Sequence, residues 1–132
     1  MFNQVNGWSS RALAALRIVA GLLFLAHGVI KVFGFPAGAE PGQQELLSLF
    51  GIGGVIELIT GLLLILGLFT RPAAFIASGQ MAVAYWMLHF PSSPYPAVNG
   101  GDAAILYCFI FLYIFTAGPG AWSIDNRTAK RF

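Results

Sequence analysis

Four long runs of apolar residues limit this chain to one kind of fold. They cover residues 13–33, 46–69, 73–90 and 103–121. About 20 consecutive apolar residues are enough to cross a lipid bilayer as a helix. Because backbone amides inside a bilayer must be paired within their own segment, each run is expected to be an α-helix. The sequence therefore predicts an all-α integral membrane protein, built as a four-helix bundle.

The composition agrees with this interpretation. Of the 132 residues, 58% are hydrophobic and 9% are charged, whereas soluble domains usually carry roughly 25% charged residues. Four spans use nearly the whole chain, so residues 1–132 are expected to form a single four-span membrane domain. The lipid bilayer is the first expected partner. The net charge of +2 reflects topology, and no nucleic acid partner is expected.

The distribution of basic residues predicts the orientation in the membrane, because lysine and arginine accumulate on the cytoplasmic side. Four spans place both termini on one face, together with the connection between the second and third spans. The opposite face carries only Lys31. The basic residues expected on the first face are Arg11, Arg17, Arg71, Arg127, Lys130 and Arg131. Both termini are therefore expected to be cytoplasmic, in a bacterial-type inner (plasma) membrane.

A lone carboxylate interrupts the second run, since Glu57 lies inside "IGGVIELITGLLLILG", residues 52–67. A charge near the bilayer centre costs several kcal/mol unless it is paired or faces a polar cavity. On the antiparallel first helix, Arg17 is expected roughly 7 Å further inward, a gap that two long side chains can bridge. Gly53 and Gly61 share a stripe with Glu57, and such glycine stripes let membrane helices approach closely. We therefore predict a charge-assisted pair between Arg17 and Glu57.

Other polar residues complete a candidate site for a quinone or another polar ligand. Gln80 is expected at a depth similar to that of Glu57, and His27 and Lys31 lie one helical turn apart near the outer surface. Glu57 and His27 are the candidates for a catalytic role. The candidate binding residues are Arg17, His27, Lys31, Glu57 and Gln80. Two interpretations of the buried pair stay open: a structural clamp that fixes helix register, and a proton or ligand site with a perturbed carboxylate.

The sequence argues against a metal or haem site. His27 and His89 are expected at depths that differ by about 7 Å, which suits two ligands of one iron poorly. The single cysteine, Cys108, excludes an intramolecular disulfide and a thiolate metal cluster. No cofactor is expected within the chain itself. Since no phosphate-binding loop, dinucleotide fingerprint, nucleophile elbow or zinc-protease motif is present, nothing in the chain alone specifies a reaction.

Three segments in order resemble the DoxX family of small four-helix membrane proteins. They are "LRIVAGLLFLAHGVIKVFG" (16–34), "GVIELITGLLLILGLFTRPAA" (54–74) and "GPGAWSID" (118–125). The resemblance implies a four-span bundle. It also implies that the protein is a membrane partner of an oxidoreductase. Relatives serve as membrane partners of such enzymes, including one that oxidises thiosulfate with a quinone. Another relative joins superoxide-detoxifying and sulfur-transferase proteins in a membrane complex.

Three functions follow as hypotheses. The first is a quinone-interacting membrane subunit of a redox complex, which would receive electrons from a soluble or membrane oxidoreductase partner. The second is a non-catalytic scaffold or assembly factor whose buried Arg17–Glu57 pair is structural. The third is a pathway for protons or small molecules. Four short helices leave little room for such a pathway in one protomer, so the third hypothesis depends on a homo-oligomer.

Overall fold

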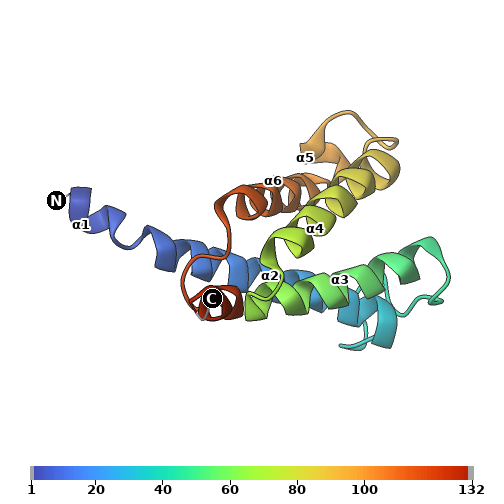
Figure 1. Ribbon diagram of the computed structural model, residues 1–132. Coiled ribbons are helices and arrows are strands. Elements are labelled where there is room, and N and C mark those ends of the chain that lie inside the picture. Colours follow the sequence, from blue (N-terminus) through green and yellow to red (C-terminus); the bar gives the residue numbers. More distant parts are fainter. Residues whose placement is uncertain (1, 131–132) are drawn as a thin grey trace.

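The computed structural model describes residues 2–130, and every regular element in that range is helical (Figure 1). In chain order the elements are α1 (Phe2–Asn6), α2 (Ser9–Phe33), α3 (Leu49–Leu66), α4 (Thr70–Ala84), the π-helical turn η1 (Tyr85–His89), α5 (Pro96–Asn99), α6 (Asp102–Ala117) and α7 (Ile124–Ala129). The predicted all-α class is confirmed. Arg131, counted above among the basic residues, lies outside the described residues.

Within residues 2–130, two helical stretches are long and apolar enough to cross a membrane. They are Phe2–Phe33 and Leu49–Leu66, whose apolar 18-residue windows have mean hydropathies of 2.1 and 2.3. Helix α6 is also apolar but shorter, with 16 residues. Helix α4 runs directly into η1, because Tyr85 keeps right-handed helical angles at the junction. The apolar run predicted at 73–90 therefore corresponds to α4 together with η1.

The ends of α3 and α6 differ from the predicted runs for local reasons. Helix α3 begins at Leu49 because the Ser48 hydroxyl accepts a hydrogen bond from the backbone N–H of Gly51 (3.1 Å). It ends at Leu66 because Gly67 has a left-handed φ of 66°, which glycine adopts at little cost. Helix α6 ends at Ala117, before Gly118 with its φ of 90°. Apolar character continues past these points, so hydrophobicity alone places the ends too far along the chain.

Helices α2 and α3 form the first of two antiparallel pairs, and glycines bring their backbones together. A Cβ atom on Gly28 would lie 2.7 Å from the carbonyl oxygen of Gly54 and from the amide nitrogen of Leu58. A Cβ atom on Gly61 would lie 2.8 Å from the amide nitrogen of Leu25. Neither position leaves room for a side chain. Gly61 of the predicted glycine stripe therefore forms part of this contact. Gly53 of that stripe lies toward Gln80 of α4 instead, and Gly54 takes its place opposite α2.

Helices α4 and α6 form the second pair. Its interface uses small side chains of α4, with Ala73, Ala74 and Ala77 at most 1% exposed. The Ser78 hydroxyl donates a hydrogen bond to the backbone carbonyl of Cys108 on α6 (2.8 Å). Polar backbone groups of α6 thus gain a partner from α4, and the alanines permit the close approach.

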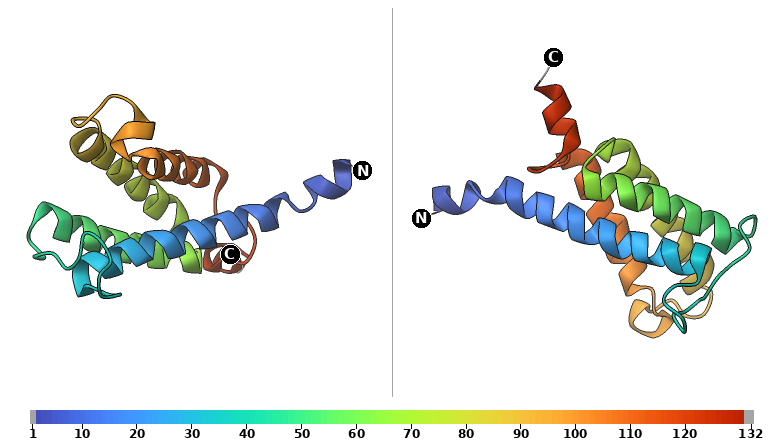
Figure 2. Two further views of the ribbon diagram at one scale, coloured as in Figure 1. Left: turned by 180° about the vertical axis from the view of Figure 1, so that it is seen from behind. Right: turned by 90° about the horizontal axis from the view of Figure 1, so that it is seen from below.

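The two pairs meet at one end of the molecule and diverge toward the other (Figures 1 and 2). We call the end where the pairs meet the closed end; it contains residues 66–70 and 118–125. We call the end where the pairs diverge the open end; it contains the loops 34–48 and 90–101. Between the pairs, Phe24 of α2 is 1% exposed, and its ring centroid lies 5.0 Å from that of Phe111 on α6. This aromatic contact joins α2 to α6.

Hydrogen bonds from the C-terminal segment fix the turn between α3 and α4 at the closed end. The Asp125 carboxylate accepts from the backbone N–H groups of Phe69 and Thr70, both at 2.9 Å. The N–H of Asp125 donates to the carbonyl of Gly67 (2.9 Å). A carboxylate at a helix N-terminus accepts hydrogen bonds from free amides and interacts favourably with the positive end of the helix dipole. Asp125 therefore caps α4 from a distant part of the chain.

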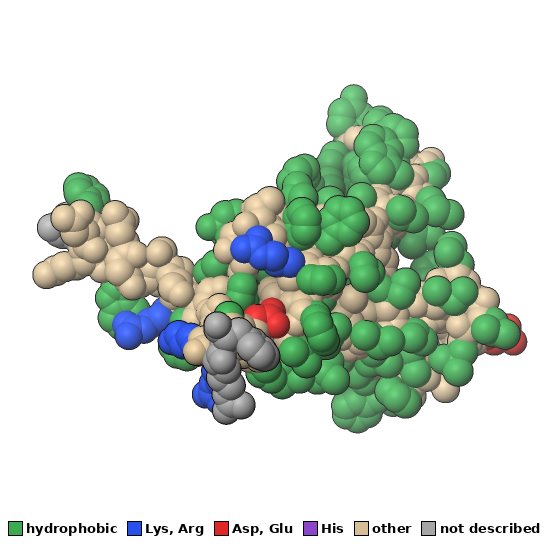
Figure 3. Space-filling view, viewed as in Figure 1, with side chains coloured by type: hydrophobic (Ala, Val, Ile, Leu, Met, Phe, Trp, Pro, Cys, Tyr) green, Lys and Arg blue, Asp and Glu red, His purple; other side chains and the backbone are tan. Residues whose placement is uncertain are grey.

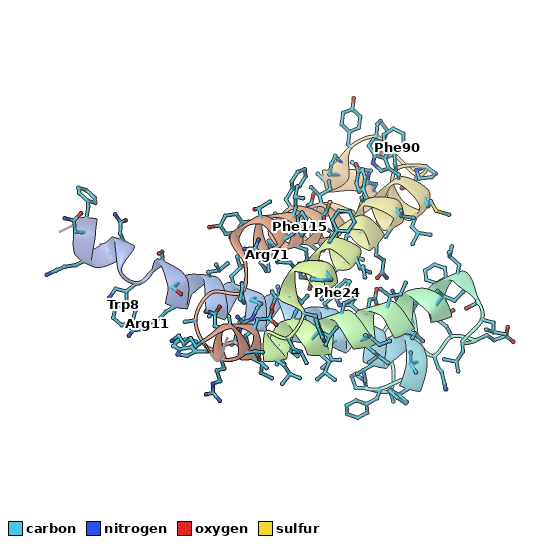
Figure 4. The ribbon with its side chains drawn as sticks, viewed as in Figure 1. Trp8, Arg11, Phe24, Arg71, Phe90 and Phe115 are labelled. Carbon is cyan, nitrogen blue, oxygen red and sulfur yellow. The ribbon has the colours of Figure 1, made fainter. Side chains whose placement is uncertain are left out.

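The last turn of α6 is capped from the opposite helix. Arg71 donates from Nη1 to the carbonyls of Phe115 and Thr116, both at 2.7 Å. Figure 4 shows Arg71 close to Phe115 at this end of the molecule. Carbonyl groups in the last turn of a helix lack partners within that helix. The arginine supplies those partners and ties the start of α4 to the end of α6.

Candidate functional site

The buried carboxylate of Glu57 joins three helices. Its side chain is 1% exposed, and its Oε1 atom lies 2.7 Å from Lys31 Nζ of α2. Gln80 of α4 donates from Nε2 to the same Oε1 atom (3.2 Å) and to the carbonyl of Gly53 (3.1 Å). We call Lys31, Glu57 and Gln80 the Glu57 cluster. Gln80, expected as a third member from its depth, is indeed there.

The predicted pair between Arg17 and Glu57 is wrong, because Glu57 pairs with Lys31 instead. Along α2, Glu57 lies between the levels of Gly21 and Gly28, which contact Gly61 and Gly54 of α3. Lys31 lies beyond one end of this interval and Arg17 beyond the other. Backbone distance alone does not separate these two candidates.

Side-chain direction decides between them. The Cα–Cβ bonds of a helix tilt toward its N-terminus. In this antiparallel pair, side chains of α2 therefore lean toward the closed end and those of α3 toward the open end. Lys31 and Glu57 lean toward each other. Arg17 leans away from Glu57, so its long side chain enters the closed end.

Arg17 binds backbone carbonyls at the closed end and is fully buried, with 0% exposure. Its Nε donates to the carbonyl of Leu64 in the last turn of α3 (2.9 Å), and its Nη2 donates to that of Trp122 (2.9 Å). Nη1 donates to the carbonyls of Pro119 and Ala121. These contacts join α2, α3 and the segment 118–123. Arg17 thus holds these three segments together and does not belong to the Glu57 cluster.

The histidines named in the sequence analysis lie outside this cluster. His27 is on an exposed face of α2. Its Nδ1 lies 2.8 Å from the carbonyl of Leu23, and its ring meets that of Tyr107 edge-on at 6.2 Å. His89 Nδ1 lies 3.1 Å from the carbonyl of Asn99 in the second open-end loop. Each histidine has its own local partner, and no group of three potential metal ligands occurs within residues 2–130.

A cavity of about 340 Å³ lies between α3 and the rod formed by α4 and η1. The three residues of the Glu57 cluster supply its polar side chains. Its other lining residues are Leu49, Phe50, Ile52, Gly53, Ile56, Ile76, Gly79, Met81, Val83, Ala84, Met87 and Leu88. The cavity is thus an apolar space with polar side chains from a single cluster. Figure 3 shows hydrophobic side chains over both helix pairs on the face seen there.

Two atoms of the cluster lack partners. Glu57 Oε2 and Gln80 Oε1 are buried, and neither has a hydrogen-bond partner among the described residues. Buried polar atoms are nearly always paired, so each exception calls for an explanation. Both atoms are acceptors, and both belong to residues that line the cavity.

The sequence of residues 12–90 matches the DoxX family. The chain belongs to the DoxX family. An uncharacterized protein of Haemophilus influenzae is 41% identical to this DoxX chain, over 98% of the chain and 99% of the relative. An uncharacterized membrane protein of Mycobacterium tuberculosis is 31% identical, over 88% of the chain and 80% of the relative. No solved structure matches the DoxX chain.

The matched region places the cavity within the DoxX pattern. Residues 12–90 include most of α2 and all of α3, α4 and η1, and these elements carry every residue that lines the cavity. The carbonyls that bind Arg17 at positions 119–122 lie outside the match, in the C-terminal part. The resemblance inferred from the sequence is confirmed, and the DoxX chain is a membrane protein.

Sequence reasoning missed the role of Asp125 at the closed end. It lies in "GPGAWSID", one of the segments that carry the family resemblance, but its connection to the start of α4 had no local signal. The segment itself held a clue to the position of Arg17. A non-helical stretch after an apolar helix leaves backbone carbonyls unpaired, and a buried guanidinium needs several acceptors.

Proposed function

We propose that this protein is the membrane subunit of a redox complex and that it binds the ring of a quinone-type lipid between α3 and α4. One observation carries the proposal: an apolar cavity of about 340 Å³ is lined by a buried carboxylate, Glu57. Sites for small organic molecules are mostly apolar, with a few polar groups, and occupy roughly 300–1,000 Å³. The divergence of α3 and α4 toward the open end gives a lipid tail a route to the bilayer.

The residues of the cavity suit such a ring. Apolar side chains of α3, α4 and η1 exclude water, and the Glu57 cluster supplies hydrogen-bonding groups. A bound quinone supplies reversible two-electron, two-proton chemistry. Glu57 would accept a hydrogen bond or a proton from the ring, while Lys31 pairs with the Oε1 atom of the same carboxylate. The family resemblance implies an oxidoreductase partner, to which we assign the supply of electrons.

Binding can be tested by filling the cavity. A Cβ atom on Gly79 would meet nothing within 4 Å, and Gly79 lines the cavity. We expect Gly79→Leu to weaken the binding of short-tailed benzoquinones, in either redox form, by at least tenfold, because the new side chain occupies the space of the ring. The measurement is a titration of purified protein in lipid nanodiscs.

Ala26→Leu is the matched control, because it adds a similar side chain at an exposed position of α2 and should leave binding unchanged. Equal affinities for Gly79→Leu and the unmodified protein would contradict the cavity site. If the unmodified protein bound no probe in either redox form, the scaffold hypothesis would replace the proposed function.

For the arrangement in the membrane, we propose four spans, formed by α2, α3, α4 with η1, and α6, and a closed end that faces the cytoplasm. Figure 3 shows the Lys and Arg side chains of the visible face near the closed end and the N-terminal helix. Arg11, Arg71, Arg127 and Lys130 are consistent with this orientation, because basic residues accumulate on the cytoplasmic side.

Cysteine labelling in intact cells tests this topology. In a Cys108→Ala background, single cysteines in loops 36–44 and 92–100 should react with an impermeant thiol reagent added outside. A cysteine at position 127 should react only after the membrane is opened. Labelling of position 127 in intact cells would overturn the orientation.

A further inference from the structure

The hydrogen bonds within the Glu57 cluster determine whether its unpaired atoms can donate or accept further hydrogen bonds. Both donors that reach the carboxylate, from Lys31 and Gln80, bind the same oxygen, Oε1. Gln80 Nε2 also donates to the carbonyl of Gly53. These two bonds fix the orientation of the Gln80 amide, because a reversed amide would place its oxygen against two acceptors. Gln80 Oε1 is therefore an acceptor by necessity.

Two acceptors, Glu57 Oε2 and Gln80 Oε1, thus remain without a partner in the described part of the chain. They belong to neighbouring side chains that both line the cavity. A ligand that fits this arrangement must bring hydrogen-bond donors. A molecule that can only accept would place its own lone pairs against those of Glu57 and Gln80.

Lys31 is the one donor of the cluster that a ligand could share. Its ammonium group has three N–H bonds, its side chain is 14% exposed, and one bond reaches Glu57. A ring carbonyl could accept from Lys31 but could give nothing to Glu57 or Gln80. A ring hydroxyl can accept from Lys31 and also donate to one of the free oxygens. The hydroxyl therefore complements the cluster and the carbonyl does not.

We infer that the cavity selects the reduced, hydroxyl-bearing form of its ring ligand, a quinol, over the oxidised quinone. This inference rests on the proposed function and adds a specificity: Glu57 and Gln80 are the residues that recognise the redox state. The apolar walls contact both forms of the ring alike, so they do not discriminate. Met81 and Met87 also line the cavity, and their flexible side chains suit the edge of the ring in either form.

The test compares three probes that share one ring and one short tail. They are a benzoquinol, the corresponding benzoquinone and the dimethyl ether of the quinol, titrated under anaerobic conditions into protein in nanodiscs. We expect the quinol to bind at least tenfold more tightly than either of the others. Such a ratio between quinol and quinone raises the two-electron midpoint potential of the bound ring by about 30 mV, which redox titration measures independently.

Two variants test whether the Glu57 cluster causes the preference for the quinol. Glu57→Gln replaces the free acceptor with an amide that can also donate, and Gln80→Met removes the second acceptor at similar size. Each should reduce the preference for the quinol to less than threefold, in protein whose folding is verified by its thermal unfolding. Ala26→Leu, at an exposed position of α2 outside the cavity, should keep the full preference.

The outcomes separate the inference from the proposed function. If quinol, quinone and ether bind equally, or the quinone binds most tightly, the selectivity is refuted while the cavity remains a ring-binding site. If no probe binds, the proposed function itself fails.

Discussion

Replacement of Arg17 by leucine is expected to prevent stable folding of the protein in detergent. The guanidinium is fully buried and donates to carbonyls of Leu64, Pro119, Ala121 and Trp122. Hydrogen bonds to charged groups contribute about 1.5–3 kcal/mol each. Their loss leaves several carbonyls without partners in a water-poor environment. We expect the free energy of unfolding to fall by more than about 4 kcal/mol, on the order of the total stability of many domains.

The measurement is thermal unfolding together with size-exclusion chromatography. Arg17→Lys keeps the charge, but its ammonium cannot reproduce the planar set of donors, so it should recover only part of the loss. Arg11→Leu is the matched control on the same helix. Arg11 stacks over the exposed ring of Trp8 at 4.6 Å, so its loss should cost less than about 1 kcal/mol. An unchanged unfolding temperature for Arg17→Leu would show that the closed end does not depend on this residue.

Lys31→Met is expected to destabilise the protein strongly, because it leaves the Glu57 carboxylate buried without its counter-charge. Removal of one partner from a buried ion pair typically costs about 3–5 kcal/mol. Glu57→Gln should cost less, since the partly exposed Lys31 can extend toward the membrane surface. The double variant should therefore be more stable than Lys31→Met alone.

A double-mutant cycle, followed by thermal unfolding in one detergent, gives the coupling energy between the two residues. Lys130→Met, which removes an exposed basic residue of the same type, controls for the change in net charge. Strictly additive losses for Lys31→Met and Glu57→Gln would show that the pair makes no energetic contribution.

The sequence was sufficient for the helical class and for part of the site. Each of the four apolar runs overlaps a helix within residues 2–130, since helices that pack or lie in lipid need an apolar surface and internal backbone pairing. The similar depths of Glu57 and Gln80 followed from counting residues along antiparallel helices. The helix ends were less accurate, because Ser48 and Gly67 end α3 through local geometry within a longer apolar run.

The partner of Glu57 could not be obtained in the same way. Position along α2 alone makes Arg17 a possible ion-pair partner of Glu57. The direction in which helical side chains tilt favours Lys31 as that partner instead. Three of the four acceptors of Arg17 lie 102 to 105 residues away in the chain, and helical periodicity carries no information over such a separation. The cavity depends on the angle between the two helix pairs, which arises only from packing in three dimensions.

The cap on α4 has a consequence for the order of events during synthesis. The first amides of α4 receive their acceptor from a residue 55 positions later, and Arg17 waits still longer for the carbonyls of the same C-terminal segment. A ribosome therefore releases the first helix pair, and then the second, before the contacts that hold them at their final angle exist. Since that angle shapes the cavity, the nascent protein acquires this cavity as one of the last steps of its maturation.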